Sequence, residues 1–163
     1  MSDATNDDLE TIRGILRSGR TAIVTSRGSG GALHSRPLAL LEAEEFEGTL
    51  WFLTFDPSTK TDEIRRHPEV NVSVADDKGY LSLSGAGSVD RSQARIDQLW
   101  NPFADAYFEG GREDPAVAVL RVDVATVEYW DTDKPAVAKA FQVVKGILTR
   151  QEPDLGENRR VEL

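Results

Sequence analysis

The chain has 163 residues, the size of one ordinary domain and long enough to bury a core. Lys and Arg number 19 and Asp and Glu 28, so the formal net charge is −9. This acidic balance argues against a protein that covers a nucleic-acid backbone or an anionic membrane, so any phosphate must be held locally by a few placed groups. Cysteine is absent, which excludes disulfides, thiolate catalysis and thiolate metal sites.

The positions of the histidines, the hydropathy and the N-terminal residues exclude further classes of protein. His34 and His67 are far apart in sequence and lack the spacing of metal ligands, so we expect both to be structural or solvent-facing. No apolar run is long enough to cross a membrane, and the acidic first ten residues lack the apolar core of a signal peptide. The expectation is a cytoplasmic protein with no metal site and with neither a nucleic acid nor a membrane as partner.

The N-terminal third predicts one helix and three strands. Thr5 and Asp8 have the spacing of a capping box, and apolar residues then recur at helical intervals until Gly19 ends the helix. The strands are rich in β-branched and aromatic residues, and short turns separate them. They are expected over residues 21–26, 32–41 and 49–55. Short turns between consecutive strands favour an antiparallel meander.

A short helix and two strands are predicted next. The helix has several good N-cap residues and should end just before Pro68. These N-cap candidates are Ser58, Thr59 and Thr61. Alternating valines indicate a half-buried strand over 70–75, and another strand is expected over 80–89. Gly85 and Gly87 in that strand indicate a bulge or the close approach of another part of the backbone.

The following segment predicts a helix, an irregular excursion and a long strand. Asp90 and Gln93 have capping-box spacing, and the helix that they begin should end at the Asn-Pro pair that follows. Residues 103–111, aromatic and then glycine-rich, are expected to run irregularly over an apolar surface. A strand over 116–130 should contain a bulge near Leu120, because its valines change from odd to even positions there.

The order of elements defines the fold class. It contains no βαβ alternation, which disfavours a doubly wound parallel sheet. The prediction is a mainly β protein, a closed or split antiparallel barrel with helices on its flanks. Residues 1–150 are expected to form one domain, with a last helix over 135–148, and residues 151–163 to form a charged, frayed tail.

The junction between the third strand and the short helix carries the first candidate site. Free N–H groups at a helix start, with hydroxyls and one lysine beside them, would make a phosphate cradle. The residues concerned are Thr54, Ser58, Thr59, Lys60 and Thr61. The alternative is ordinary N-cap chemistry beside a solvated lysine.

Two further sets of residues have a functional interpretation and a structural one. Arg36 could bind a phosphate through two hydrogen bonds, or it could be a surface arginine beside Pro37 in an edge strand. The aromatic residues could flank a planar ring, or they could pack in a core or an interface. They are Trp51, Phe52, Phe55, Trp100, Phe103, Tyr107, Phe108, Tyr129 and Trp130.

Taken in order, these stretches resemble the flavin-binding core of the pyridoxamine 5′-phosphate oxidase-like split barrels. The resemblance is carried by His34-Ser35-Arg36-Pro37-Leu38, by Leu50-Trp51-Phe52-Leu53-Thr54 and by the run from Ser58 to Val70. Later stretches resemble one branch of that family, the bacterial general stress proteins. These are the run from Leu99 to Phe103, Tyr107-Phe108, Gly110-Gly111 and the run from Glu128 to Asp131.

The resemblance implies a homodimer of six-stranded antiparallel split β-barrels with FMN bound at the subunit interface. The flavin contacts that it implies are Arg36, Pro37, Leu38, Phe52, Leu53, Thr54, Ser58, Lys60, Thr61, Trp100 and Trp130. Within this set, the phosphate would lie on Ser58, Lys60 and Thr61, and the two tryptophans would come from the partner subunit. The C-terminal residues lack the substrate-binding histidine of the true pyridoxamine phosphate oxidases, so oxidation of vitamin B6 is not expected.

The expected function is that of a flavin-dependent oxidoreductase acting on a small-molecule redox substrate. FMN would carry the redox chemistry, so the absence of a catalytic side-chain motif is compatible with this function. One alternative is a flavin-binding stress protein without turnover, such as a buffer, sensor or carrier. Others are a deazaflavin or haem binder on the same barrel and a structural dimer whose cradle is only a helix cap.

Overall fold

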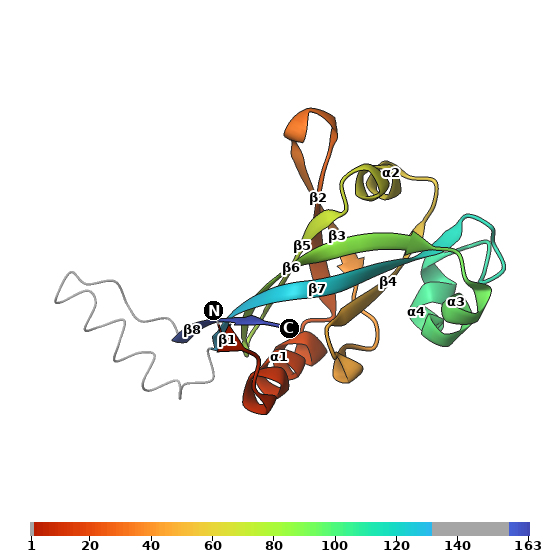
Figure 1. Cartoon of the computed structure of the whole chain (residues 1–163). Coiled ribbons are helices and arrows are strands. Elements are labelled where there is room, and N and C mark those ends of the chain that lie inside the picture. Colours follow the sequence, from red (N-terminus) through yellow and green to blue (C-terminus); the bar gives the residue numbers. More distant parts are fainter. Residues whose placement is uncertain (1, 132–156) are drawn as a thin grey trace, which may run out of the picture.

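The computed structural model describes residues 2–131 and 157–163, and Figure 1 shows long curved strands with helices around them. In chain order they are β1 (Ser2–Asp3), α1 (Asn6–Ser18), β2 (Thr21–Arg27), η1 (Ser29–Gly31), β3 (Leu33–Ala39), η2 (Ala43–Glu45), β4 (Thr49–Phe55), α2 (Thr59–Arg66), β5 (Glu69–Asp76), β6 (Gly79–Asp90), α3 (Gln93–Leu99), α4 (Pro102–Tyr107), β7 (Val117–Asp131) and β8 (Glu157–Glu162). None of the helices within these described ranges is long and apolar enough to span a bilayer.

Six strands, β2 to β7, curl into an open barrel. The antiparallel ladders follow the order β3-β2-β5-β6-β7, and β4 pairs with the first half of β7. Between β3 and β4, the described residues make a single isolated bridge, from Leu41 to Trp51. The barrel is therefore split along this seam, which confirms the predicted mainly β fold with flanking helices.

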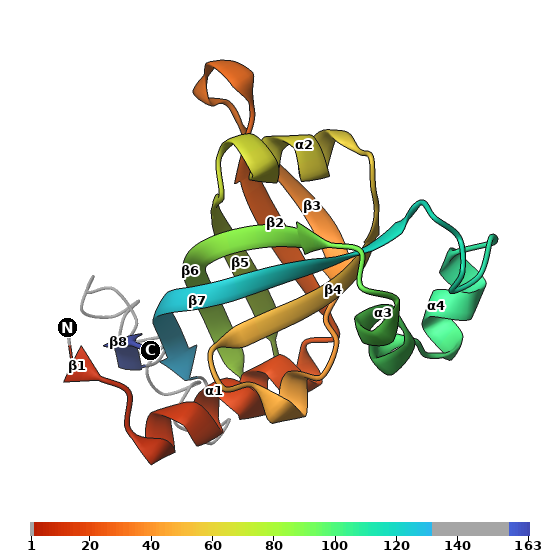
Figure 2. The same cartoon turned by 45° about the vertical axis from the view of Figure 1, so that its right-hand side comes forward.

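Helices cover both ends and one side of the barrel. Figure 2 shows α1 across one end, α2 across the opposite end, and α3 with α4 beside β4. Side chains from α1, α2 and the barrel strands fill the main core, among them Ile12, Leu16, Ile64, Phe52, Val72 and Leu83. A second, smaller cluster joins α3 and α4 to the outer face of β7 and contains Ile96, Leu99, Ala104, Phe108, Val117 and Val119.

The long strand β7 differs from its prediction in the position of the bulge. Pairing with β6 is unbroken at Leu120, and the register shifts instead between Ser84 and Gly85, where Ala125 has no partner on β6. The valines change parity near Leu120 because β7 is buried on both faces there, by the main core on one side and by the α3–α4 cluster on the other. The bulge predicted at Gly85 is confirmed.

Three local predictions after residue 90 are corrected. The cap of α3 is Ser92, whose hydroxyl accepts from the N–H of Arg95, rather than Asp90. The expected irregular excursion begins with a helix, α4, because the Asn101 side chain caps it and the proline occupies its first turn. Within the tail, β8 pairs with β7 instead of fraying, whereas the helix predicted over 135–148 lies outside the described residues.

Candidate anion-binding site

The connection between β4 and α2 is fixed by a buried aspartate. Asp56 is 1% exposed and accepts two hydrogen bonds of 2.7 Å from Arg65 and one of 2.8 Å from Arg91. The bonds from Arg65, with those from Thr61 and Arg91, outweigh the effect of burial and hold the pKa of this carboxyl well below its usual range. Arg65 of α2 and Arg91, which follows β6, therefore fix the place where α2 begins.

The first turn of α2 uses its two hydroxyls as a cap. The Ser58 side chain accepts from the N–H of Thr61, and the Thr61 hydroxyl accepts from the N–H of Ser58 and lies within 3.0 Å of the Ser58 carbonyl. Thr61 is fully buried. Both hydroxyls thus cap the first turn of α2, as the N-cap interpretation expects. The N–H groups of Thr59 and Lys60 have no helical partner, as in any first turn, and they stay free to bind an anion.

Lys60, in that first turn, is a half-buried cation with no counter-ion in the described part of the chain. Among the residues that the structure describes, no carboxylate pairs with its ammonium group. Burial and the neighbouring Arg36 guanidinium both lower the pKa of Lys60, because each disfavours a second positive charge at this point. Two like charges held together from two elements favour an anion between them.

Arg36 is held from beneath rather than left free on the surface. Its guanidinium donates to Ser26 Oγ at 2.8 Å and to Glu63 Oε2 at 2.9 Å. The side chain is 27% exposed, and its Nε–H has no partner among the described residues. These bonds fix the direction of the group and leave donors for a ligand, which excludes the interpretation of Arg36 as an unconstrained surface arginine.

Glu63 is the buried acid that organises this site. It is 7% exposed, its Oε2 accepts from Ser26 and Arg36, and its Oε1 lies 2.6 Å from Nδ1 of His34. Burial alone would raise its pKa, but the hydrogen bonds from Ser26, His34 and Arg36 prevail and lower it to about 2. Glu63 is therefore ionised at neutral pH, and it binds groups from β2 and β3 to α2.

The sequence analysis missed Glu63, Ser26 and the role of His34. His34 and Arg36 alternate along β3 and so face the same side, while Lys60 and Glu63 stand one turn apart on α2. These spacings were visible in the sequence. The packing of α2 against β3 was not, because the bond between Glu63 and His34 joins residues 29 positions apart.

Gly28 leaves the space that the His34 ring occupies. A Cβ atom at Gly28 would lie 2.8 Å from Cε1 of His34, closer than real Cβ contacts, and 3.2 Å from Oε1 of Glu63, which is tighter than most of them. The ring therefore packs directly against the backbone of the turn between β2 and β3. A glycine is needed here for close approach and not for its dihedral angles.

The other flavin contacts predicted on β3 and β4 are not part of the hydrogen-bonded group around Glu63. Pro37 lies in β3, which pairs only with β2 among the described strands, and Leu38 packs against the main core. On β4, Phe52 and Thr54 point into the barrel and are buried, whereas Leu53 faces the α3–α4 cluster.

The two tryptophans are not brought to α2 within one chain. Trp100 ends α3 and donates to Asp105 at 2.6 Å. Trp130 pairs with Tyr80 near the far end of β7, away from the Val117 end that adjoins Phe55. Their predicted approach from a partner subunit stays a prediction.

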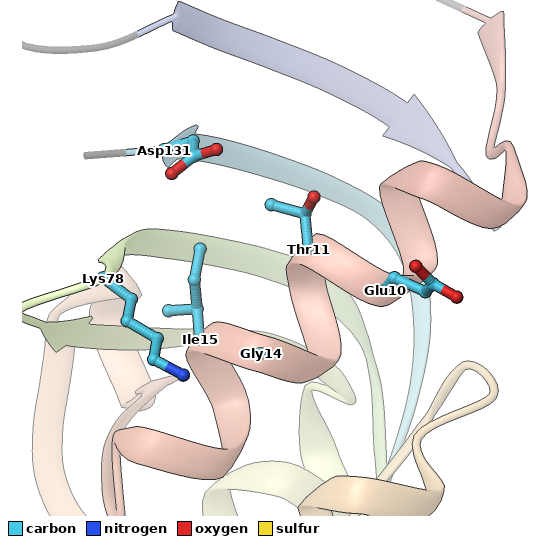
Figure 3. Close-up of a pocket in the computed structure, with 6 residues that line it drawn as sticks. All are labelled: Glu10, Thr11, Gly14, Ile15, Lys78 and Asp131. Carbon is cyan, nitrogen blue, oxygen red and sulfur yellow. The ribbon is translucent and has the colours of Figure 1, made fainter. Parts of the chain in front are cut away.

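Of two hollows in the described part of the chain, one lies far from the Lys60–Arg36 pair and one reaches Ser26, which accepts a hydrogen bond from Arg36. One, of about 290 Å³, is at the α1 end of the barrel and is lined by Glu10, Thr11, Gly14, Ile15, Lys78 and Asp131 (Figure 3). The other, of about 610 Å³, is an open groove on the outer face of the sheet, lined by residues of β2, β5, β6 and β7 and by Leu33. The first is at the opposite end of the barrel from α2, so it is separate from the anion site (Figure 2).

The structure thus defines an open antiparallel barrel with two cations at the start of the helix that covers one end. The model of the family described as "Pyridoxamine 5'-phosphate oxidase like" matches residues 7–154. The chain belongs to this family, as the sequence resemblance predicted.

Individual relatives agree with this assignment. The protein bli-3 of Neurospora crassa is 28% identical over 94% of this chain and 78% of its own length. A crystal structure of a candidate general stress protein 26 from Jannaschia sp. CCS1 is 25% identical, with a TM-score of 0.74 over 98% of this chain and all of that one. A general stress FMN/FAD binding protein from Xanthomonas citri is 28% identical, with a TM-score of 0.70 over 80% of this chain and 93% of that one.

Proposed function

We propose that this protein binds FMN and acts as a flavin-dependent oxidoreductase on a small-molecule substrate. The observation that carries the proposal is the pair of cations, Lys60 and Arg36, at the start of α2, where no described carboxylate neutralises Lys60. A terminal phosphate suits this donor set, because its oxygens can accept from an ammonium, a guanidinium and helix N–H groups together. Family membership and the flavin named for the Xanthomonas citri relative support the same ligand.

Each part of the site would have a distinct task. Lys60, Arg36 and the N–H groups of Thr59 and Lys60 would bind the phosphate, while Glu63 holds Arg36 in place. Leu38, Leu53 and Thr54 would lie along the remainder of the flavin, as the family resemblance implies. Bound FMN would supply hydride or electron transfer, and the protein would bind and orient it.

The proposal includes a homodimer in the cytoplasm, with FMN at the subunit interface. The outer face of β2, β5 and β6 is rich in small uncharged side chains, which suits the close approach of another surface. It carries Thr25, Asn71, Ser73, Ser82, Ser84 and Ala86, with Ile23 40% exposed and Tyr80 50% exposed. Light scattering should give twice the chain mass, and a monomer that still binds FMN tightly would contradict this arrangement.

The visible absorption spectrum of the purified protein tests flavin binding. Added FMN should stay with the protein through gel filtration, with its bands shifted from those of free FMN. Bleaching of these bands by NADH or NADPH under anaerobic conditions, followed by recovery with an acceptor, would support oxidoreductase activity. Stable binding without bleaching by any reductant would favour the flavin buffer or sensor, and an unchanged FMN spectrum would contradict flavin binding itself.

A further inference from the structure

We propose that His34 is the third cation of the anion site and that it selects the dianionic form of a phosphate monoester, taking up a proton as the ligand binds. This inference rests on the proposed function, because it assigns the phosphate of FMN to the site beside Arg36 and Lys60. It adds a residue that the family resemblance did not place among the flavin contacts, and it names the charge state of the ligand.

Geometry places His34 within the same hydrogen-bonded group as Arg36. The two side chains project from the same face of β3, and each contacts a different oxygen of the single Glu63 carboxylate, at 2.6 Å and 2.9 Å. The His34 side chain is 47% exposed, so it faces solvent on one side and the buried acid on the other. A charge gained on His34 would therefore act on any anion bound by Arg36.

The contact with Glu63 determines which ring nitrogen can gain the proton. An ionised carboxylate can only accept hydrogen bonds, so Nδ1 of His34 carries a hydrogen in both charge states of the ring. A proton gained on binding must then go to Nε2, for which no partner is present among the described residues. The Cε1 edge of the ring faces Gly28, where a Cβ atom would lie only 2.8 Å away.

The net charge of the site depends on whether His34 is protonated, and each value can be compared with the charge of a phosphate group. Arg36 and Lys60 contribute two positive charges and Glu63 one negative charge, so the group has a net charge of +1 when His34 is neutral. Protonation of His34 raises the net charge to +2. A phosphate monoester carries up to two negative charges near neutral pH, whereas each phosphorus of a dinucleotide diphosphate carries one. The protonated site therefore matches the monoester dianion.

The other charged groups near His34 lie outside this group, and their charges are the same in both forms of the His34 ring. At the far end of α2, Arg27 of β2 lies 3.0 Å from Nδ1 of His67, so these two groups contact each other. Arg65 is paired with Asp56 and Asp62, and Arg66 is exposed. Lys60 and Glu63 are the α2 groups that interact with Arg36.

Nuclear magnetic resonance of the ring protons tests the inference on the unmodified chain. The sequence contains two histidines, so two titrating signals are expected, and His34→Gln and His67→Gln each assign one of them. The probes are FMN, riboflavin, which lacks the phosphate, and inorganic phosphate. Saturating FMN should move the titration midpoint of His34 upward by about one pH unit, the shift that a tenfold effect on affinity requires. Riboflavin should not move it, and the His67 midpoint should stay fixed with every probe.

Binding measurements give a second readout. His34→Gln keeps a donor for Glu63 but cannot become charged, so its FMN affinity should fall about tenfold at pH 6 and less than twofold at pH 8. His67→Gln should bind FMN like the wild-type protein at both values. Loss of folding in one variant leaves the wild-type titration as the deciding test.

The outcomes separate this inference from the proposed function. FMN that binds without moving the His34 midpoint would overturn the role of His34 and leave flavin binding intact. Phosphate that moves the midpoint when FMN does not bind would support the anion site and overturn the flavin. If none of the three probes binds, both proposals fail.

Discussion

Arg36 donates to Glu63 across 2.9 Å, so the cation that faces the candidate ligand is held by a buried acid from another element. A group fixed in this way binds a ligand without first losing conformational freedom. The charged Arg36 side chain comes from β3, and its hydrogen bond to Glu63 of α2 fixes its orientation. This relationship makes Glu63 the residue whose loss should affect both stability and binding.

Glu63→Gln should destabilise the protein by about 1–3 kcal/mol, because Ser26, His34 and Arg36 would lose their charged acceptor. FMN affinity should fall as well, since Arg36 is no longer held in place. Urea unfolding and a flavin-fluorescence titration measure the two effects. Glu10→Gln, on the exposed face of α1, is the matched control and should change neither.

The pH dependence of stability follows from the lowered pKa of Glu63. Its value is about 2 in the folded protein against 4.5 as reference, so the unfolded chain binds more protons between these two values. The stabilisation is therefore complete above about pH 4.5 and is lost as the pH falls toward 2. Relative to the wild-type protein, Glu63→Gln should show a flatter stability profile across this interval. An identical slope in both proteins would contradict the assignment.

Lys60→Ala should weaken FMN binding by about 1–3 kcal/mol, the usual scale of a charge-assisted hydrogen bond. Fold stability should change little or rise slightly, because the substitution removes a half-buried charge that Arg36 repels. Lys78→Ala, at the α1 end of the barrel, is the control and should bind FMN normally (Figure 3). Unchanged affinity in the Lys60 variant would remove this residue from the phosphate site.

Another buried acid, Asp8, joins α1 to β7 and β8. Asp8 is fully buried and accepts from Tyr129 at 2.7 Å, while Arg159 of β8 lies 3.2 Å from the same oxygen. Burial and the neighbouring Asp8 raise the pKa of Tyr129 to about 12. Tyr129→Phe should therefore cost about 1–2 kcal/mol in urea unfolding at neutral pH. Tyr107→Phe, on a tyrosine that is 69% exposed, should cost nothing measurable.

Substitution by alanine should lower the stability of the protein at Gly28 and raise it at Gly14. Gly28→Ala inserts a Cβ 2.8 Å from the His34 ring, so it should destabilise the protein by about 1–3 kcal/mol and displace His34 from Glu63. Gly14→Ala meets nothing within 4 Å in the middle of α1 and should stabilise by up to about 1 kcal/mol. Thermal unfolding of both variants provides the comparison. A stabilising Gly28→Ala would show that the ring can move at no cost.

Local chemistry made much of the fold predictable from the sequence. Three elements have sequence signals that lie within a few residues of one another. They are the capping box of Thr5 and Asp8, the strand over 49–55 and the cap of α2 at Ser58. Where two local signals compete, the prediction was wrong. Asn101 with the following proline indicated the end of one helix, but the same pair also caps and begins α4.

Long-range packing limited what could be predicted of the site. Arg36 and Lys60 were identified because their residue types suggest phosphate binding whatever lies around them. Glu63 appeared as one more charge on a helix, and only the packing of α2 over β2 and β3 shows that it is buried. Long-range packing also explains the odd-to-even change of the β7 valines, which had predicted a bulge near Leu120. The α3–α4 cluster buries the outer face of that strand, so valines occur on both faces.

The affinity of the wild-type protein for FMN compared with riboflavin tests the phosphate site most directly. The two ligands share the ring and the ribityl chain and differ only in the phosphate, so their affinity ratio isolates the contribution of that group. A phosphate held by Lys60 and Arg36 predicts that FMN binds at least tenfold more tightly, with most of this preference lost in Lys60→Ala. Equal affinities for the two ligands in the wild-type protein would contradict the assignment of these cations to the flavin phosphate.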